Sequence, residues 1–571
     1  MLGALAAAWV HLCSGKKAEA GEWLAETMLR TKRAMESSLP FAMDPVVYDF
    51  AVNDRGTQAE LKTDAEMPRG YYPLMVPRWL RSDIQSLSPS IRKQLEQVGK
   101  ACRAPESNDL AARLLDRILP GAPKATKQSE SLDSLLKAYG FDVIAHQQIR
   151  EDILNGRLGL SQNRLPATAQ IEDVAPSEIQ DARACGSRSS QAAEDVIAGG
   201  GVRRQALAAG VGSRWTQGAG VVKALHPFHK FGGKHRTFLE VHLAKSRRTA
   251  KQFGRAPAHV FTTGYLTEEP IRQALQQVDY RGFTVAAPGR SVGLRMIPTQ
   301  RDLHFAWNEM PQQMLDEQQE KMRQSGRAAL LNWAKQCGEA ADYIDNLPMQ
   351  CMHPVGHWYE IPNMLRSGVL HQLLTDHPEV RYLLLHNVDT LGATIDPAVL
   401  GLHMASGACL SFEVITRRLD DRGGGLAKVD GRLRLVEGLA MPSEEEEFKL
   451  SFYNSMTTWI DVDQLLRVFG LTRNKLADRN AVDEAVRTLG RRLPTYITLK
   501  DVKKRWGNGQ EDVFPVSQFE KLWGDMTSLP EVDCQFIAVS TVRGRQLKEQ
   551  AQLDGWLRDG SAAEIESLLE W

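Results

Sequence analysis

The sequence has no excess of charge of either sign and no long apolar run. Lys plus Arg number 70 and Asp plus Glu number 70, so the formal net charge is zero. The overall charge therefore gives no reason to expect nucleic acid or a membrane as a partner, although a local basic cleft would not show in this sum. No segment approaches the roughly 20 apolar residues that a membrane span needs.

The sequence also lacks a regular cysteine pattern. The seven cysteines form no CxxC pair and their number is odd, which favours reduced thiols in a cytoplasm over a disulfide framework or a structural zinc site. Cys351, His353 and His357 lie close together, but they lack a second ligand cluster, so a transition-metal site is not expected. The cysteines are at positions 13, 102, 185, 337, 351, 409 and 534.

The chain length of 571 residues allows two to four domains. The first 15 residues resemble the apolar part of a signal peptide, but no basic residue precedes them, so a buried first helix is preferred. We predict a mostly helical N-terminal domain at 1–181, a Gly/Ser-rich linker at 182–201, a larger α/β domain at 202–470 and a small α/β C-terminal domain at 471–571.

From about residue 202 onward, short apolar runs alternate with amphipathic segments, which predicts a mixed or parallel sheet with helices on both faces. In such open sheets, ligands bind beyond the carboxyl ends of the strands. The expected strands are 205–209, 259–263, 283–286, 381–386, 410–414, 433–437 and 457–460. The expected helices are 237–253, 268–277, 314–338, 361–370 and 397–406.

A glycine turn follows the first expected strand, in the stretch LAAGVGSRWTQGAGVVK at 207–223. Glycines let several backbone N–H groups point at one anion, and Arg214 and Lys223 can neutralise phosphate charge. An ordinary turn between a strand and a helix is the alternative. The segment that leads into this turn, VRRQALAAG, carries Arg203 and Arg204, which predicts that the start of the strand is less deeply buried than usual. Because a glycine-rich linker precedes this segment, we also expect the phosphate-binding turn to be mobile.

Asp389 directly follows the most apolar expected strand, RYLLLH at 381–386. A carboxylate at the ligand-binding end of a central strand is well placed to hold Mg²⁺ against the phosphates of a nucleotide. The alternative is that Asp389 caps the next turn. The local sequence does not decide between the two.

Four stretches together resemble the eukaryotic-type UDP-glucose pyrophosphorylase family. LAAGVGSR with KALHPF resembles its nucleotide-binding signature, and HNVDTLGATIDPAVL resembles its NxDNLGAxxD stretch. DRGGGLAKVDGRLRLVEGLAMP and FYNSMTTWIDVDQL are similar to two later segments of the family. The order and spacing of all four agree over roughly residues 201–468.

The resemblance implies a Rossmann-like, GT-A-like nucleotidyltransferase domain that makes UDP-sugar and pyrophosphate from UTP and a hexose 1-phosphate, most simply glucose 1-phosphate, with Mg²⁺. An N-acetylhexosamine 1-phosphate, or a relative that binds UDP-sugars with little or no catalysis, is the alternative. The oligomeric state stays open. Carried over onto this sequence, the resemblance implies catalytic roles for Arg214, Lys223 and Asp389, with Asp389 also holding the metal; nucleotide binding by Ala208, Ala209, Gly210, Gly212, Gln300, Gly356 and His357; and sugar binding by Gly424, Gly425, Glu437 and Asn454.

The sequence departs from the family pattern at three places. Ser517 stands where the family has a lysine that reaches the phosphates, and Lys521 could replace it only if the segment is arranged differently. Met456 stands where a second asparagine is expected, which puts the sugar pocket in doubt. Trp358 follows His357 where a small residue usually lets the base approach.

Overall fold

The computed structural model describes residues 17–34, 131–183, 190–210, 212, 215, 222–280, 282–309, 317–418, 421–505 and 511–571. The chain divides into two compact units, Met1–Asp64 and Ala65–Trp571. Helix α1 (Lys17–Ala34) is the described part of the first unit. The apolar segment predicted as a buried first helix lies outside the described residues. Within those residues, no helix is both long enough and apolar enough to cross a bilayer.

The second unit is built on an eleven-stranded mixed sheet, so the predicted α/β architecture is confirmed. Its main path runs β2-β17-β11-β14-β10-β3-β6-β7, and β1, β12 and β13 join it through β14. Strand β14 is antiparallel to both of its path neighbours, β10 and β11, whereas the other neighbours on the path are parallel. The strands are β1 (Ile171–Glu172), β2 (Gln180–Asp181), β3 (Val202–Leu207), β6 (His259–Thr262), β7 (Thr284–Ala287), β10 (Tyr382–Asn387), β11 (Leu410–Thr416), β12 (Gly425–Val429), β13 (Arg432–Val436), β14 (Phe452–Asp461) and β17 (Cys534–Ala538).

Helices cover both faces of this sheet, as the alternation along β10 shows. Leu383 and Leu385 pack into a core with α14 (Glu360–Arg366), α15 (Val369–Asp376), α17 (Val462–Val468) and α18 (Arg479–Arg492). Tyr382 and Leu384 point the other way, into a core with α7 (Gln191–Ala198) and α16 (Pro397–Ser406). On β3, Ala206 packs in a further core with α9 (Phe238–Phe253), and α10 (Glu268–Gln276) contributes to that core as well.

All the expected strands are present, and the last one begins earlier than expected, at Phe452. Most of the expected helices occur near their predicted bounds, including α12 (Glu317–Cys337). The helix expected at 361–370 is instead two helices, α14 and α15, separated by Ser367 and Gly368. Glycine has a low helix propensity, so a break at this point is unsurprising.

Three local expectations were wrong. Helix α7 (Gln191–Ala198) lies inside the predicted linker, because Ala193 and Ile197 are four residues apart and both are buried on one helical face. All six residues of β3 are buried, including Arg203 and Arg204, so its start is not shallow. The predicted division at residue 470 does not separate the sheet, because β17 pairs with β11.

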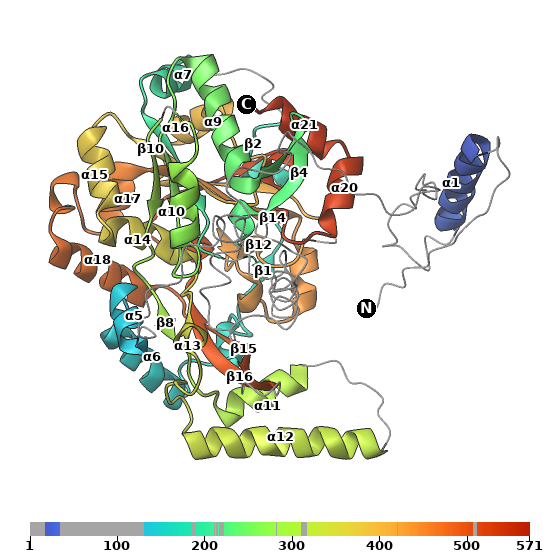
Figure 1. The fold of residues 1–571 in the computed structure, drawn as a ribbon, viewed down its shortest axis with the longest axis vertical. Coiled ribbons are helices and arrows are strands. Elements are labelled where there is room, and N and C mark those ends of the chain that lie inside the picture. Colours follow the sequence, from blue (N-terminus) through green and yellow to red (C-terminus); the bar gives the residue numbers. More distant parts are fainter. Residues whose placement is uncertain are drawn as a thin grey trace, which may run out of the picture. The chain divides into compact units, whose positions relative to one another are not determined.

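A second, smaller group of strands lies beside the main sheet. The hairpin of β15 (Tyr496–Arg505) and β16 (Glu511–Glu520) is joined through a Met296–Ser517 bridge to the region of β8 (Gly293–Leu294) and β9 (Met352–His353). Figure 1 shows the hairpin next to α11 (Gln300–Glu309), away from β10 and α9.

Candidate active site

The order of strands reverses at the pair β3 and β10. From β3 the chain proceeds outward to β6 and β7 on one side, whereas β10 lies on the other side. The two strands are parallel, with Leu207 opposite Asn387 at their carboxyl ends. Ligands of open α/β sheets bind at such a reversal, beyond the carboxyl ends of the strands.

Lys223 and Asp389 meet at this reversal. The Lys223 ammonium donates to Asp389 Oδ2 at 2.7 Å and to the Leu547 carbonyl at 2.5 Å. It also lies 5.2 Å from the ring centre of Trp215 and 5.3 Å from that of Phe238. The side chains are 6% and 14% exposed, so the pair is partly shielded from water and its attraction is stronger than that of a surface pair.

Asp389 has the chemistry to hold a metal ion with one oxygen. Its Oδ1 is buried without a hydrogen-bond partner in the described structure. Among the described residues, no group of three or more His, Cys, Asp and Glu side chains could hold a metal. One free carboxylate oxygen fits Mg²⁺, which commonly binds through one or two carboxylates and takes its other ligands from phosphates and water.

The glycine turn lies over this pair. Gly210 has open space where a side chain would stand, and Gly212 has a φ of +71°, with the space of its absent Cβ taken by the Lys223 side chain. The Ala208 amide donates to the Thr262 carbonyl, so the sheet already uses it, and Ala209 accepts from Thr267. Arg214 lies outside the described residues.

His357 and Gly356 lie against the start of the segment that follows β16. His357 Nδ1 accepts a hydrogen bond from the Trp523 amide at 2.9 Å. Burial and, to a smaller extent, the nearby Lys548 ammonium lower the pKa of His357 to about 4, so the ring is neutral near pH 7. A side chain at Gly356 would collide with the backbone of Lys521.

The Trp358 side chain is packed inside the protein. It is fully buried, its indole N–H points to Met526 Sδ at 3.3 Å, and its ring packs over Gly490 of α18. This side chain therefore belongs to the core cluster that also contains Trp523 and Met526.

Gln300 is not brought to the Lys223 and Asp389 pair. It is the first residue of α11, and its amide donates to Glu339 at 2.5 Å. Helix α11 lies with α12 away from β10 (Figure 1). Its assignment to the uracil base stays a prediction that this arrangement does not favour.

Glu437 directly follows β13 and Asn454 lies in β14, and β12 pairs with both of these strands. Gly425 pairs with both Val436 and Tyr453, so the Gly424 and Gly425 loop lies between the two predicted sugar-binding side chains. Burial and the neighbouring Asp525 raise the pKa of Glu437 well above its usual range, and Glu437 Oε1 is buried without a described partner. The Asn454 side chain instead forms a hydrogen bond within its own strand, in which Oδ1 accepts from the Met456 amide at 2.9 Å.

Met456 forms part of a β-bulge. Val414 pairs with Asn454 and Glu413 with Thr457, so Ser455 and Met456 are extra residues on β14. Met456 has a φ of +57°, which is strained for a side chain of this kind. Bulges of this type often re-aim side chains next to binding sites.

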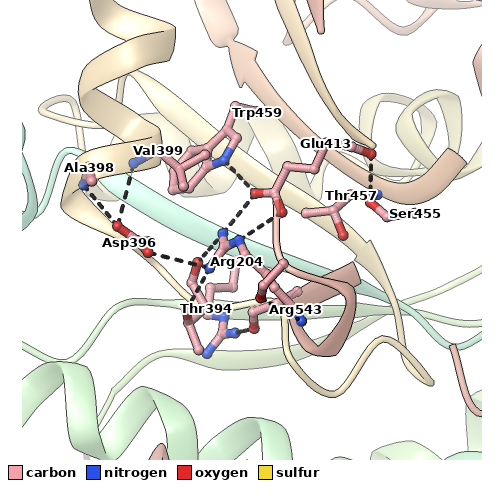
Figure 2. Close-up of polar contacts among 12 residues, drawn as sticks. Arg204, Thr394, Asp396, Ala398, Val399, Glu413, Ser455, Thr457, Trp459 and Arg543 are labelled. Carbon is pink, nitrogen blue, oxygen red and sulfur yellow. Dashed lines mark hydrogen bonds and ion pairs between the residues drawn. The ribbon is translucent and has the colours of Figure 1, made fainter. Parts of the chain in front are cut away.

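The segment 540–548 was not expected at this site. Arg543 donates to both carboxylate oxygens of the fully buried Glu413, at 2.8 and 2.7 Å, and Glu413 also accepts from Trp459 (Figure 2). Gln546 donates to the Ser455 carbonyl in the bulge, and the Leu547 amide donates to the Asp389 carbonyl. The basic run RGRQLK was a possible signal, but it lay in the part predicted to fold as a separate domain.

Ser517, which stands where the family has a lysine, and Lys521, the alternative cation, are both buried. Ser517 exchanges backbone hydrogen bonds with Met296. The Lys521 ammonium donates to Thr495 Oγ1 at 2.6 Å and to the Leu493 carbonyl at 3.1 Å, just past the end of α18, and burial lowers its pKa to about 8. In this arrangement Lys521 completes the end of a helix and does not point toward Asp389.

Residues 339–489 match the family model described as UTP–glucose-1-phosphate uridylyltransferase, UDPGP. Over this segment, the predicted resemblance to the UDPGP family is confirmed. The Saccharomyces cerevisiae UTP–glucose-1-phosphate uridylyltransferase is 32% identical over 127 residues, which are 21% of this chain and 25% of the yeast protein. The relative of that name from Encephalitozoon cuniculi is 32% identical over 120 residues, 20% of this chain and 24% of its own length.

The chain thus aligns with only about a quarter of the length of these curated relatives. In three dimensions the likeness extends further. A solved structure, a UDP-glucose phosphorylase from Trypanosoma brucei, superposes with a TM-score of 0.50 at 17% identity, covering 73% of this chain and 75% of that one. At this identity the likeness concerns the fold, which confirms the predicted central sheet.

Proposed function

We propose that this chain transfers a uridylyl group from UTP to a hexose 1-phosphate, most simply glucose 1-phosphate, with release of pyrophosphate. The observation that carries the proposal is the Lys223 and Asp389 ion pair at the strand reversal, with a buried carboxylate oxygen left over. Two further observations support the proposal. Residues 339–489 match the UTP–glucose-1-phosphate uridylyltransferase family model, and the fold resembles that of a UDP-glucose phosphorylase.

In the proposed reaction, a phosphate oxygen of the sugar 1-phosphate attacks the α-phosphorus of UTP. The bond from that phosphorus to the bridging oxygen breaks, and pyrophosphate leaves with the electron pair. The protein has little covalent chemistry to do, so it must position two anions that repel each other and stabilise the charge on the leaving group.

The residues divide this work. The glycine turn at Gly210 and Gly212 offers backbone N–H groups, and Lys223 orients the Asp389 carboxylate by occupying its Oδ2. Held by Asp389, Mg²⁺ would supply neutralisation of charge on the phosphate oxygens. Glu437 would hold sugar hydroxyls, for which a group that can both donate and accept is suited.

The test is pyrophosphate release by the full chain with UTP, Mg²⁺ and a panel of sugar phosphates that includes glucose 1-phosphate and an N-acetylhexosamine 1-phosphate. We expect turnover with one member of the panel. Omission of Mg²⁺ or replacement of UTP by ATP should reduce it strongly. Absence of turnover with every sugar phosphate would contradict the proposal.

A second candidate function is binding of a UDP-sugar without turnover. The placement of Ser517 and Lys521 favours it, since neither presents a cation toward Asp389. Calorimetry with UDP-glucose distinguishes the two functions: binding together with an inactive enzyme would support the second, and turnover would exclude it.

A further inference from the structure

Lys548 lies between the Lys223 and Asp389 pair and the predicted sugar-binding residues of the candidate site. On one side, the preceding residue Leu547 accepts from the Lys223 ammonium and donates to the Asp389 carbonyl. On the other side, the Lys548 ammonium donates to the Tyr453 hydroxyl at 2.7 Å. Tyr453 precedes Asn454 and pairs with Gly425, so Lys548 reaches the loop and the strand that carry the predicted sugar site.

The segment that carries Lys548 is held rigidly. Arg543 is bound to Glu413 and Thr394 in the core (Figure 2), and Gly544 packs against Ser455 so closely that a Cβ there would lie 2.8 Å from the Ser455 Cβ. A short, well-anchored segment can present a side chain with little loss of conformational entropy when a ligand binds. Lys548 itself is partly exposed, whereas the residues from Arg543 to Leu547 are buried.

The surroundings of Lys548 match those of a phosphate-binding cation. Its ammonium lowers the pKa of His357 beyond the effect of burial, and it opposes the rise that burial and Asp525 cause at Glu437. It therefore lies within electrostatic reach of one residue predicted at the nucleotide and one predicted at the sugar. A lysine ammonium has three donors, and Tyr453 is the hydrogen-bond partner that the structure describes for it.

We propose that Lys548 binds the phosphate of the hexose 1-phosphate and, after transfer, the same phosphate within the UDP-sugar. This inference rests on the proposed uridylyl transfer. It assigns to the segment 540–548 the cation that neither Ser517 nor Lys521 presents at the site. The phosphate of the acceptor sugar is favoured over those of UTP because Lys548 is bonded on the sugar side, at Tyr453.

The test compares Lys548→Gln with Lys548→Arg and with a matched control, Lys475→Gln, which changes an exposed lysine in the same chain. In pyrophosphate-release assays, Lys548→Gln should lower kcat/KM for glucose 1-phosphate by about 10²-fold, as loss of a preorganised charge contact does. The KM for UTP should change by less than about threefold, because only the acceptor phosphate loses its cation. Lys548→Arg should retain much of the activity, and Lys475→Gln should match the wild type.

If Lys548→Gln does not fold, Lys548→Met, which keeps an unbranched chain without charge, takes its place. An active wild type with Lys548→Gln and Lys475→Gln equally active would overturn this inference and leave the proposed function standing. An inactive wild type would contradict the proposed function instead. In that case calorimetry with UDP-glucose decides the inference: weaker binding by Lys548→Gln than by Lys475→Gln supports it, and equal or undetectable binding overturns it.

Discussion

At the carboxyl ends of β3 and β10, the Asp389 carboxylate is matched by the Lys223 ammonium at 2.7 Å. Around Gly424 and Gly425, by contrast, Glu437 and Asp525 are two buried carboxyls, and the charge of Asp525 disfavours ionisation of Glu437. Burial is the main cause that raises the pKa of both. Tyr496 donates to Asp525 at 3.0 Å, but no such bond is described for Glu437 Oε1.

This contrast suggests a division of chemistry. A carboxylate with a lysine on one oxygen and the other oxygen free suits a site for phosphates and a cation. A carboxyl with a raised pKa keeps its proton to higher pH and can donate as well as accept, which suits neutral sugar hydroxyls.

The largest effect is expected at Arg543, because its segment, 540–548, forms hydrogen bonds both to Asp389 and to the β14 bulge. Arg543→Met leaves the buried Glu413 carboxylate without its cation, and breaking a buried pair in this way typically costs about 3–5 kcal/mol of unfolding free energy. Urea unfolding measures the loss. The control Arg558→Met, at an exposed position in α20 (Gln552–Arg558), should stay within about 0.5 kcal/mol of the wild type. A loss of similar size in both variants would show that the Glu413 pair is not a special support.

The second effect concerns the charge-paired half. Lys223→Ala and Asp389→Ala should each lower turnover by about 10²-fold or more, because each removes a preorganised charge. The double variant should lose less than the product of the two factors, since the residues act as a pair. The exposed Asp376→Ala is the control. Near-wild-type turnover in a folded Lys223→Ala protein would remove the central assignment.

The third effect concerns Glu437 alone. Glu437→Gln replaces one carboxyl oxygen by an NH2 group, so a sugar hydroxyl that donates to that oxygen loses its acceptor. We therefore expect KM for the sugar 1-phosphate to rise by about tenfold, or about 1.4 kcal/mol. KM for UTP should hardly change. Steady-state kinetics with each substrate varied in turn measures the difference, with the exposed Glu445→Gln as control. Equal changes in both KM values would contradict a separation into halves.

The smallest effect is a pH dependence of stability. With its pKa raised in the folded state, Glu437 binds a proton there at pH values where the unfolded chain, with an ordinary value of 4.5, has already lost it. The folded state therefore binds more protons than the unfolded state in this pH range, and the unfolding free energy should fall as pH rises above about 4.5. We expect Glu437→Gln to remove a decline on the order of 1 kcal/mol between about pH 5 and about pH 7. An unchanged slope would show that Glu437 ionises normally.

The sequence by itself was enough to locate the sheet and the ion-paired half. The expected strands and most expected helices depend on apolar runs with a period of two or of about 3.6 residues, which is local information. Asp389 could be found because it directly follows the most apolar strand, and Lys223 because it follows the glycine turn. Their 2.7 Å contact follows from the parallel pairing of β3 with β10, which brings the two carboxyl ends to one edge.

Only the tertiary structure decided the roles of Arg204, Trp358 and the segment 540–548. An arginine is ordinarily expected at the surface, yet Arg204 is buried, and its N–H groups donate to the Ala393 carbonyl and to Ser246, which lies on α9. Trp358 lies next to the predicted base-binding His357 in sequence, but its side chain is fully buried and its indole N–H points to Met526 Sδ. Arg543 meets Glu413 across 130 residues of sequence because β17 returns the chain to the sheet edge beside β11. Such long-range pairings leave no periodic trace in the sequence, since they depend on which strands become neighbours.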